Sequence, residues 1–280
     1  MTVYFNGDFV AKEEVSISPN DRGFVFGDGV YEVVRAEDGA LFRLDDHRRR
    51  LHRSLSEIRL LDAVDLEAVW DAVQGLLPRN DLTTGHAKVY LQITRGAAPR
   101  QHAFPDPSVE PTVYARAEAI DLPVEKWEQG VKVILRPDRR WARCDIKSLN
   151  YLPNVLANQA AMEAGAYEAL LTREGFVTEG THSSMAAVVD GTVVTRPLTN
   201  HVLPSITRQV LLELCADQGI PTTERPIAVD ELSDADELLL LGTTTGIMPI
   251  VQVEDEAVGD GTPGPVVRDL QDAFRALTPA

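Results

Sequence analysis

The chain has 280 residues, of which 44% are apolar and 6% aromatic, and a formal net charge of −16. This length and apolar content are enough for a buried core and for more than one domain. The acidic balance argues against nucleic-acid binding, which needs clustered basic residues. No apolar run reaches the roughly 20 residues of a membrane span, and the first residues form no signal peptide. We therefore expect a cytosolic protein without a membrane segment.

Basic residues are unevenly divided, because only five of the 27 are lysines. Acidic, lysine-poor surfaces remain hydrated at high salt, so this composition predicts a salt-adapted source. The two cysteines, Cys144 and Cys215, are too few for a disulfide framework and form no CxxC pair.

The first 120 residues alternate between strand and helix patterns. The turn at Asn6-Gly7 predicts a hairpin that joins Val3–Phe5 to Phe9–Val10. Glycines at 23, 27 and 29 permit tight turns before a strand over 30–35. The remaining predicted elements are a helix capped by Asp45 or Asp46, a helix over 66–77 that ends at Pro78, and strands over 89–93 and 112–119.

Residues 121–128 look like a connector, after which the pattern changes. The elements that follow are strands over 131–136, 168–172 and 237–241, an apolar stretch over 247–253, helices over 154–164, over 205–218 and from Pro265, and a hairpin that turns at Asp190-Gly191. Mixed strands and helices on both sides of the connector predict two α/β domains, over 1–120 and 129–280. A cleft between such domains is the natural place for a ligand.

Lys147 is the first candidate for a chemical role. It is the only lysine after residue 132, in a chain that otherwise prefers arginine. A lone lysine is usually a solvated surface charge. Only an amine, however, can lose its proton and condense with an aldehyde, which arginine cannot do.

Three other segments contain groups that suit a charged ligand. Glu179 precedes Gly180 and a run of hydroxyl residues, where a carboxylate can hold a proton on a pyridine nitrogen. Ser205 opens a predicted helix, whose N-terminus suits a phosphate. The loop 242–246 places three threonines between glycines. Each pattern alone is commonplace, and no Walker or GxGxxG motif favours a nucleotide.

Together these segments resemble the class IV (fold type IV) aminotransferases, which use pyridoxal phosphate (PLP). The stretch 21–32, with Asp21-Arg22-Gly23 and Phe26-Gly27-Asp28-Gly29, resembles the opening signature of that family. The segments 147–150, 178–180, 206–207 and 243–244 match it in the same order. The resemblance implies a two-domain α/β fold with PLP at the domain interface, Lys147 as its Schiff-base lysine and Glu179 as partner of the pyridine nitrogen. The other cofactor-binding residues that it implies are Arg50, Ile206, Thr207, Thr243, Thr244, His182 and Ser183.

Within that family the loop 94–105 resembles the subgroup that acts on D-amino acids. The resemblance implies that Arg100, His102 and Tyr31 bind the substrate α-carboxylate, and that Val33 and Ser184 line the side-chain pocket. The chain departs from the subgroup over 181–184, where Thr-His-Ser-Ser replaces the usual Ser-Ser-Ser-Asn.

Two further residues lie next to these motifs in the sequence. Tyr151 either reaches the 3′-oxygen of the cofactor or packs in the core. His47 lies three residues before Arg50 and so on the same helix face, and we expect it to be a surface histidine.

The predicted reaction is a ping-pong transamination from D-amino acids such as D-alanine and D-glutamate to 2-oxo acids such as 2-oxoglutarate or pyruvate. The resemblance also implies a homodimer, with Arg100 and His102 reaching the partner's site, and no metal is expected. The alternatives are a branched-chain L-amino-acid or (R)-amine transaminase, aminodeoxychorismate lyase, and a non-catalytic binding module on the same fold.

Overall fold

The computed structural model describes residues 1–277, which form two compact units. Unit 1 contains Met1–Asp121 together with the short segment Ile146–Asn150, and unit 2 contains Leu122–Asp145 and the residues from Tyr151 onward. The sequence-based division assigns Lys147 to the second domain, whereas the segment that carries it packs within unit 1. No helix within residues 1–277 is long and apolar enough to cross a membrane.

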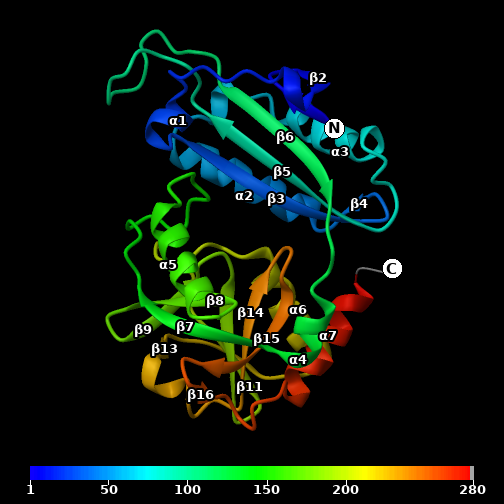
Figure 1. Cartoon of the computed structure of the whole chain (residues 1–280), viewed down its shortest axis with the longest axis vertical. Helices are drawn as coiled ribbons and strands as arrows, with labels where there is room; N and C mark the ends of the chain where they lie inside the picture. Colours follow the sequence, from blue (N-terminus) through cyan, green and yellow to red (C-terminus); the bar gives the residue numbers. More distant parts are fainter. Residues whose placement is uncertain (278–280) are drawn as a thin grey trace. The chain divides into compact units, whose positions relative to one another are not determined.

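Unit 1 is built on a six-stranded antiparallel sheet with the order β2-β1-β6-β5-β3-β4. The strands are β1 (Thr2–Phe5), β2 (Asp8–Ala11), β3 (Gly29–Glu37), β4 (Ala40–Leu41), β5 (His86–Thr94) and β6 (Thr112–Ala119). The helices are α1 (Arg22–Phe26), α2 (Leu44–Glu57) and α3 (Leu66–Arg79), with single 3-10 turns at Lys12–Glu14 (η1) and Leu61–Ala63 (η2). Helices α2 and α3 cover one face of the sheet (Figure 1).

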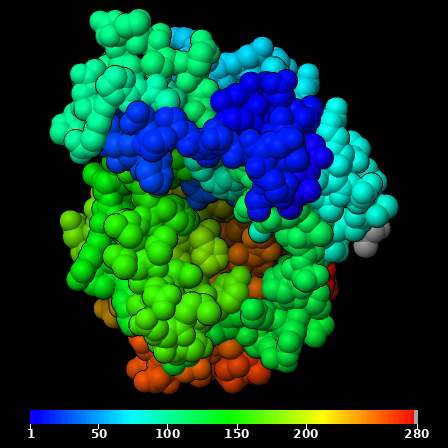
Figure 2. Space-filling view, turned by 45° about the horizontal axis from the view of Figure 1, so that its top comes forward, coloured from blue at the N-terminus to red at the C-terminus, as the bar shows by residue number. Residues whose placement is uncertain are grey.

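The alternation of side chains along β5 determines which face of this sheet is buried. Val89, Leu91 and Ile93 are at most 1% exposed, whereas the residues between them are half-buried. The buried face meets Leu51 and Leu55 of α2 and apolar residues of α3. The other face carries half-buried side chains, among them Tyr31, Tyr90 and Gln92. The N-terminal strands are dark blue in Figure 2, and three of the four residues of β2 are exposed.

Unit 2 is built on a mixed ten-stranded sheet with the order β12-β11-β10-β14-β15-β7-β8-β9-β13, to which β16 adds beside β15. Its strands are β7 (Val131–Pro137), β8 (Glu168–Arg173), β9 (Phe176–Gly180), β10 (Ser184–Val189), β11 (Thr192–Thr195), β12 (Thr222–Glu224), β13 (Ile227–Ala228), β14 (Glu237–Gly242), β15 (Gly246–Val253) and β16 (Glu256–Ala257). Its helices are α4 (Val124–Gln129), α5 (Leu152–Glu163), α6 (Ile206–Gln218) and α7 (Pro265–Ala276), with a 3-10 turn at Val229–Glu231 (η3).

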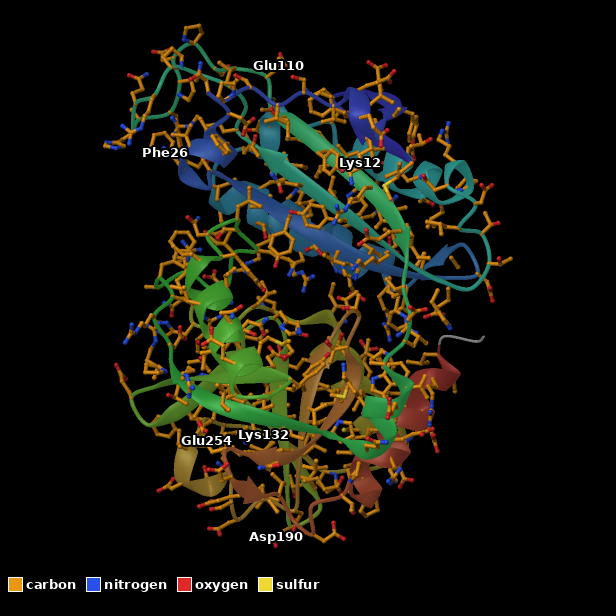
Figure 3. All side chains as sticks on the ribbon, in the orientation of Figure 1. Lys12, Phe26, Glu110, Lys132, Asp190 and Glu254 are labelled. Atoms are coloured by element: carbon orange, nitrogen blue, oxygen red, sulfur yellow. The ribbon has the colours of Figure 1, made fainter. Side chains whose placement is uncertain are left out.

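The two predicted hairpins are confirmed by their backbone geometry. Asn6 and Gly7 have φ values of 49° and 104°, and Asp190 and Gly191 have 49° and 70°. Two successive positive φ values match the twist of a tight hairpin. Asp190 therefore lies at the tip of the β10–β11 hairpin (Figure 3).

Several element boundaries differ from the sequence prediction. The predicted connector over 121–128 contains helix α4, because Trp127 is buried in the core of unit 2 and its indole nitrogen donates to the carbonyl oxygen of Thr245 at 2.7 Å. Helix α2 begins at Leu44, after Arg43 in a left-handed conformation, rather than at an aspartate cap. Helix α3 includes Pro78 in its last turn instead of ending there.

Candidate functional site

Lys147 lies in unit 1, in an extended segment beside the first half of β3. The backbone N–H of Tyr31 donates to the carbonyl oxygen of Lys147 at 3.0 Å. Leu149 donates in turn to the carbonyl oxygen of Gly29 at 3.1 Å, and Val30 and Ser148 form an isolated β-bridge. The lysine is thus fixed to the strand by backbone pairing.

The Lys147 amine is half-buried and lies over an aromatic ring. Its Nζ atom is 4.3 Å from the ring centroid of Tyr31, and Tyr31 stacks in turn on Tyr90 at 5.9 Å. Among residues 1–277 no carboxylate pairs with this amine. A primary amine that is not held in an ion pair can condense with an aldehyde, which the proposed chemistry needs.

A buried carboxylate, Glu32, connects β3 to helix α2. Glu32 is fully buried and accepts two hydrogen bonds from Arg50, one from Nε at 2.7 Å and one from Nη2 at 2.8 Å. His47 Nδ1 lies 2.8 Å from the same carboxylate. Burial raises the pKa of Glu32, but the guanidinium of Arg50 and the hydrogen bond from His47 outweigh it and hold that pKa far below its ordinary value.

The prediction that His47 is a surface residue is wrong. The side chain is 1% exposed, because the helix face that it shares with Arg50 packs against β3. Burial lowers the pKa of His47, so its imidazole is neutral at pH 7 and donates to Glu32.

Arg100 and His102 lie on the exposed loop that joins β5 to β6. The guanidinium carbon of Arg100 is 5.3 Å from the ring centroid of Phe26, and the His102 ring centroid is 5.8 Å from it. The structure therefore places each of these two predicted carboxylate-binding side chains near the ring of Phe26. Val33, the predicted pocket residue, points to the same face of β3 as Tyr31, two residues away.

In unit 2, Glu179 is buried near the end of β9 with two donors on its carboxylate. Arg140 donates to Oε1, and the backbone N–H of Leu203 donates to Oε2 at 3.1 Å. Arg140 also pairs with Asp138 at 2.9 Å and donates to the carbonyl oxygen of His201. Burial raises the pKa of Glu179, and the charge and hydrogen bond of Arg140 oppose this increase.

Sequence reasoning missed Arg140, although its side chain is only 6% exposed. It follows Arg139 in the sequence, and no local pattern separates a buried arginine from an exposed one. Only the tertiary structure pairs it with Glu179.

The two predicted phosphate-binding segments of unit 2 are both well ordered by local bonds. Ser205 caps α6 by accepting a hydrogen bond from Arg208 N at 3.2 Å, so the helix begins at Ile206 and Thr207. A helix start presents backbone N–H groups that the helix itself does not use. Thr243 and Thr244 form the half-exposed turn between Gly242 and Gly246, which pair across β14 and β15.

A second buried carboxylate, Glu168, organises the segment after β9. It accepts hydrogen bonds from the backbone of His182 at 2.7 Å and from the hydroxyl of Ser183 at 2.8 Å. A Cβ at Gly180 would lie 2.3 Å from Glu168 Oε1, so only glycine fits there. Ser184 pairs with Leu241 on β14, next to the threonine turn.

Tyr151 has a structural contact in this segment. Its hydroxyl donates to the carbonyl oxygen of Thr181 at 3.0 Å, and Asn154 Nδ2 donates to the same oxygen at 2.6 Å. The half-buried tyrosine thus joins the start of α5 to the segment that Glu168 holds.

Replacing Glu32 tests the buried cluster of unit 1. Glu32→Gln leaves Arg50 with a neutral partner, which should lower the free energy of unfolding by about 3 to 5 kcal/mol at pH 7. Because the pKa of Glu32 is depressed in the folded state, its contribution is present above the usual glutamate range and is lost as the pH falls. The deficit should therefore shrink below about pH 4. Denaturant titrations at several pH values measure this loss in the free energy of unfolding. The control is Glu67→Gln, at an exposed glutamate, which should change the free energy of unfolding by less than about 0.5 kcal/mol.

Replacing Arg140 tests the charge balance at Glu179. Arg140→Met removes the group that opposes the raised pKa of Glu179 and that lowers the pKa of Asp138. Both carboxylates then cost more to ionise in the folded state, so the stability deficit should be larger at about pH 7.5 than at about pH 5. Thermal melts at the two pH values measure this difference. Arg139→Met, at the exposed neighbour, is the matched control, and an equal pH dependence in the two variants would contradict the assignment.

Comparison with known proteins shows which family this chain belongs to. Residues 29–253 match the family model described as amino-transferase class IV. The D-alanine aminotransferase of Staphylococcus haemolyticus is 43% identical over 272 residues, which cover 97% of this chain and 96% of that protein.

Solved structures share the fold at lower identity. The branched-chain amino acid aminotransferase of Escherichia coli superposes with a TM-score of 0.91 at 26% identity and covers 99% of this chain and 94% of that one. The branched-chain aminotransferase of Thermoproteus uzoniensis, solved with norvaline, gives a TM-score of 0.83 at 25% identity and covers 99% of this chain and 95% of that one. The match to the family model over most of the chain establishes that this protein belongs to the class IV aminotransferases.

Proposed function

We infer that this aminotransferase moves the amino group of D-amino acids, with D-alanine and D-glutamate as the natural pair, to 2-oxo acids such as 2-oxoglutarate or pyruvate. One observation carries this inference: Arg100 and His102 lie on the same exposed loop, and both side chains lie near the ring of Phe26. A guanidinium and an imidazole on one loop can together hold a carboxylate in one orientation. The 43% identity to a D-alanine aminotransferase over nearly the full length supports the same substrate class.

The cofactor of this class is PLP, and each unit by itself contains residues that suit a part of it. Lys147 provides an amine without a carboxylate partner among residues 1–277, and Glu179 provides a buried carboxylate for the ring nitrogen. The start of α6 and the threonine turn provide N–H and hydroxyl donors for a phosphate. The proposed set also includes Arg50, which Glu32 holds. It further includes His182 and Ser183, in the segment that Glu168 holds.

When bound, PLP supplies an electron sink for the negative charge that develops at the substrate Cα. We assign the proton movement to Lys147, whose amine accepts the proton from the substrate Cα. Glu179 would keep a proton on the ring nitrogen, and the charge and hydrogen bond of Arg140 lower the pKa of Glu179 against the increase that burial causes. Tyr31, Arg100 and His102 hold the substrate carboxylate, and Val33 and Ser184 limit the room for its side chain.

We further propose that the working enzyme is a homodimer in which Arg100 and His102 complete the partner's site. Both side chains are exposed in the single chain. A carboxylate-binding pair gains strength when it is shielded from water, which a second subunit would provide.

The experiment that tests the function is a panel of D- and L-amino acids and (R)-1-phenylethylamine with 2-oxoglutarate and pyruvate as acceptors. D-Alanine and D-glutamate should be the best donors. Branched-chain L-amino acids are the second candidate, because solved enzymes with that activity share the fold. Faster turnover of L-valine than of D-alanine would overturn the proposal, as would formation of 4-aminobenzoate without transamination.

Replacing Lys147 tests its chemical role. Lys147→Ala should lower kcat by about 1000-fold or more, because no other amine replaces the general base, and should abolish the near-visible absorbance of the bound cofactor. The matched control is Lys132→Ala, at a lysine of β7 (Figure 3) that pairs with the exposed Asp255. Lys132→Ala should retain activity and absorbance.

Replacing Arg100 tests carboxylate recognition. Arg100→Ala should raise KM for D-alanine by about 10- to 100-fold, the value of a charge-assisted pair. It should raise KM for (R)-1-phenylethylamine, which has no carboxylate, by less than about twofold. Arg139→Ala should change neither KM.

Mixing Lys147→Ala, which should lack turnover, with Arg100→Ala, whose KM should be raised, tests the dimer at a D-alanine concentration far below the KM of Arg100→Ala. In a mixed dimer of Lys147→Ala and Arg100→Ala chains, one site receives both native residues only if Arg100 acts across the interface. Recovery of activity after joint refolding is therefore expected. No recovery, with mixed dimers present by mass spectrometry, would place Arg100 in its own subunit's site.

A further inference from the structure

The loop between β5 and β6 is long and exposed, but close backbone contacts fix its two ends. Arg22 N donates to the carbonyl oxygen of Gly96 at 2.9 Å, and Ala98 N donates to the carbonyl oxygen of Asn20 at 3.2 Å. Gly96 has a φ of 90°, and a Cβ there would lie 1.9 Å from the carbonyl oxygen of Glu110. The loop therefore leaves and re-enters the sheet in one fixed place.

The side chain of Arg22 holds the middle of this loop. Its Nη1 atom donates to the carbonyl oxygens of Gln101 at 2.7 Å and Ala103 at 3.2 Å, and Nη2 donates to that of His102 at 3.4 Å. Arg22 is only 4% exposed. Three successive carbonyl groups, directly after Arg100, are thus bound to one buried guanidinium.

Asp28 fixes Arg22 in turn. Arg22 Nε donates to Asp28 Oδ2 at 2.7 Å, and Arg95 donates to both oxygens of Asp28, at 2.9 and 3.0 Å. Burial raises the pKa of Asp28, but the hydrogen bonds from the two arginines outweigh it and lower that pKa below its ordinary value. The carboxylate therefore stays charged and keeps both guanidinium groups in place. Arg95 also lies 3.7 Å from the ring centroid of Phe104, at the far end of the loop.

Phe26 completes the arrangement by contacting the side chains that the loop presents. The guanidinium carbon of Arg100 lies 5.3 Å from its ring centroid, and the tilted ring of His102 lies 5.8 Å from it. The guanidinium carbon of Arg22 approaches the same ring to 4.9 Å. Phe26 is the last residue of the short helix α1 (Figure 3). Gly27 follows in the left-handed conformation and ends the helix directly before Asp28. One helix turn thus supplies both a backbone clamp and an aromatic surface.

We propose that α1 and Asp28 form a positioning device for substrate recognition: Arg22 fixes the backbone of the loop, and Phe26 fixes the side chains of Arg100 and His102. The inference rests on the proposed function, in which these two side chains bind the substrate carboxylate. An exposed arginine otherwise samples many rotamers, and ordering it in advance removes that entropic cost from binding. Phe26 and Arg22 are positioning residues and act only through the loop.

The first test replaces Phe26 with an apolar residue that has no ring. Phe26→Leu should raise KM for D-alanine by about 3- to 30-fold, the range of a cation–π contact, with kcat changed by less than about twofold. The inhibition constant of propionate, a probe that carries the carboxylate without an amine, should rise by the same factor. Phe24→Leu, two residues away in the same helix and 79% exposed, is the matched control and should change neither constant.

The second test releases the loop backbone. Arg22→Met should make the chain cleavable by trypsin after Arg100 several times faster than the wild type, with the site identified by mass spectrometry. Arg22→Lys should restore part of the protection, because an ammonium can still donate to the loop. If Arg22→Met does not fold, the KM and the propionate inhibition constant of Phe26→Leu test the proposal instead. If it folds and neither cleavage nor KM changes, the role of Arg22 is overturned.

Arg100→Ala separates failure of this inference from failure of the proposed function. One outcome is that Arg100→Ala weakens the binding of propionate while Phe26→Leu, like Phe24→Leu, changes neither constant. In that case the carboxylate role of Arg100 stands and the positioning role of Phe26 is overturned. If Arg100→Ala leaves the inhibition constant of propionate unchanged, the carboxylate role fails, and the positioning device fails with it.

Discussion

The ion pair between Glu32 and Arg50 is the interaction on which the organisation of unit 1 depends. Removing a carboxylate from water is costly, and the cost is met here by a bidentate guanidinium and the imidazole of His47. Because Glu32 belongs to β3 and its partners to α2, the pair determines how the helix lies on the strand. The same strand carries Tyr31 on its other face and pairs with the backbone of Lys147 along its free edge. The position of the reactive amine is thus coupled to a charge cluster that has no chemical step of its own.

Buried arginine–carboxylate pairs recur at each place where the proposed chemistry needs a fixed group. Arg140 faces Glu179 in unit 2, and Arg22 and Arg95 face Asp28 beneath the loop that carries Arg100. Arginine suits these positions because its planar group can donate to a carboxylate and to backbone carbonyls at once, as Arg22 does. A lysine can donate as well but cannot span three carbonyl groups and a carboxylate in one plane. The preference for arginine in this chain, which the sequence suggested was an adaptation to salt, thus also has a structural use.

In the candidate site, the groups proposed to react are distinct from the groups that hold them in position. Lys147 lies without a carboxylate partner among residues 1–277, while Ser183 and Glu179 are each fixed by a buried charge. Glu168 and Gly180 show how narrow the tolerance is, since a single added carbon at Gly180 would collide with the carboxylate. Such supporting residues limit which substitutions the fold accepts.

The sequence by itself determined the family and most strands, and it led to the proposed roles of Lys147 and Glu179, because ordered motifs and side-chain periodicity are local properties. Only the tertiary structure decided the rest. His47 looked like a surface residue because helical spacing gives a face but not what covers it. Arg140 and Arg22 could not be told from exposed arginines, since burial of a charge depends on a partner 39 and 6 residues away. The segment 146–150 joined unit 1 through backbone pairing with β3, a non-local contact that no local pattern encodes.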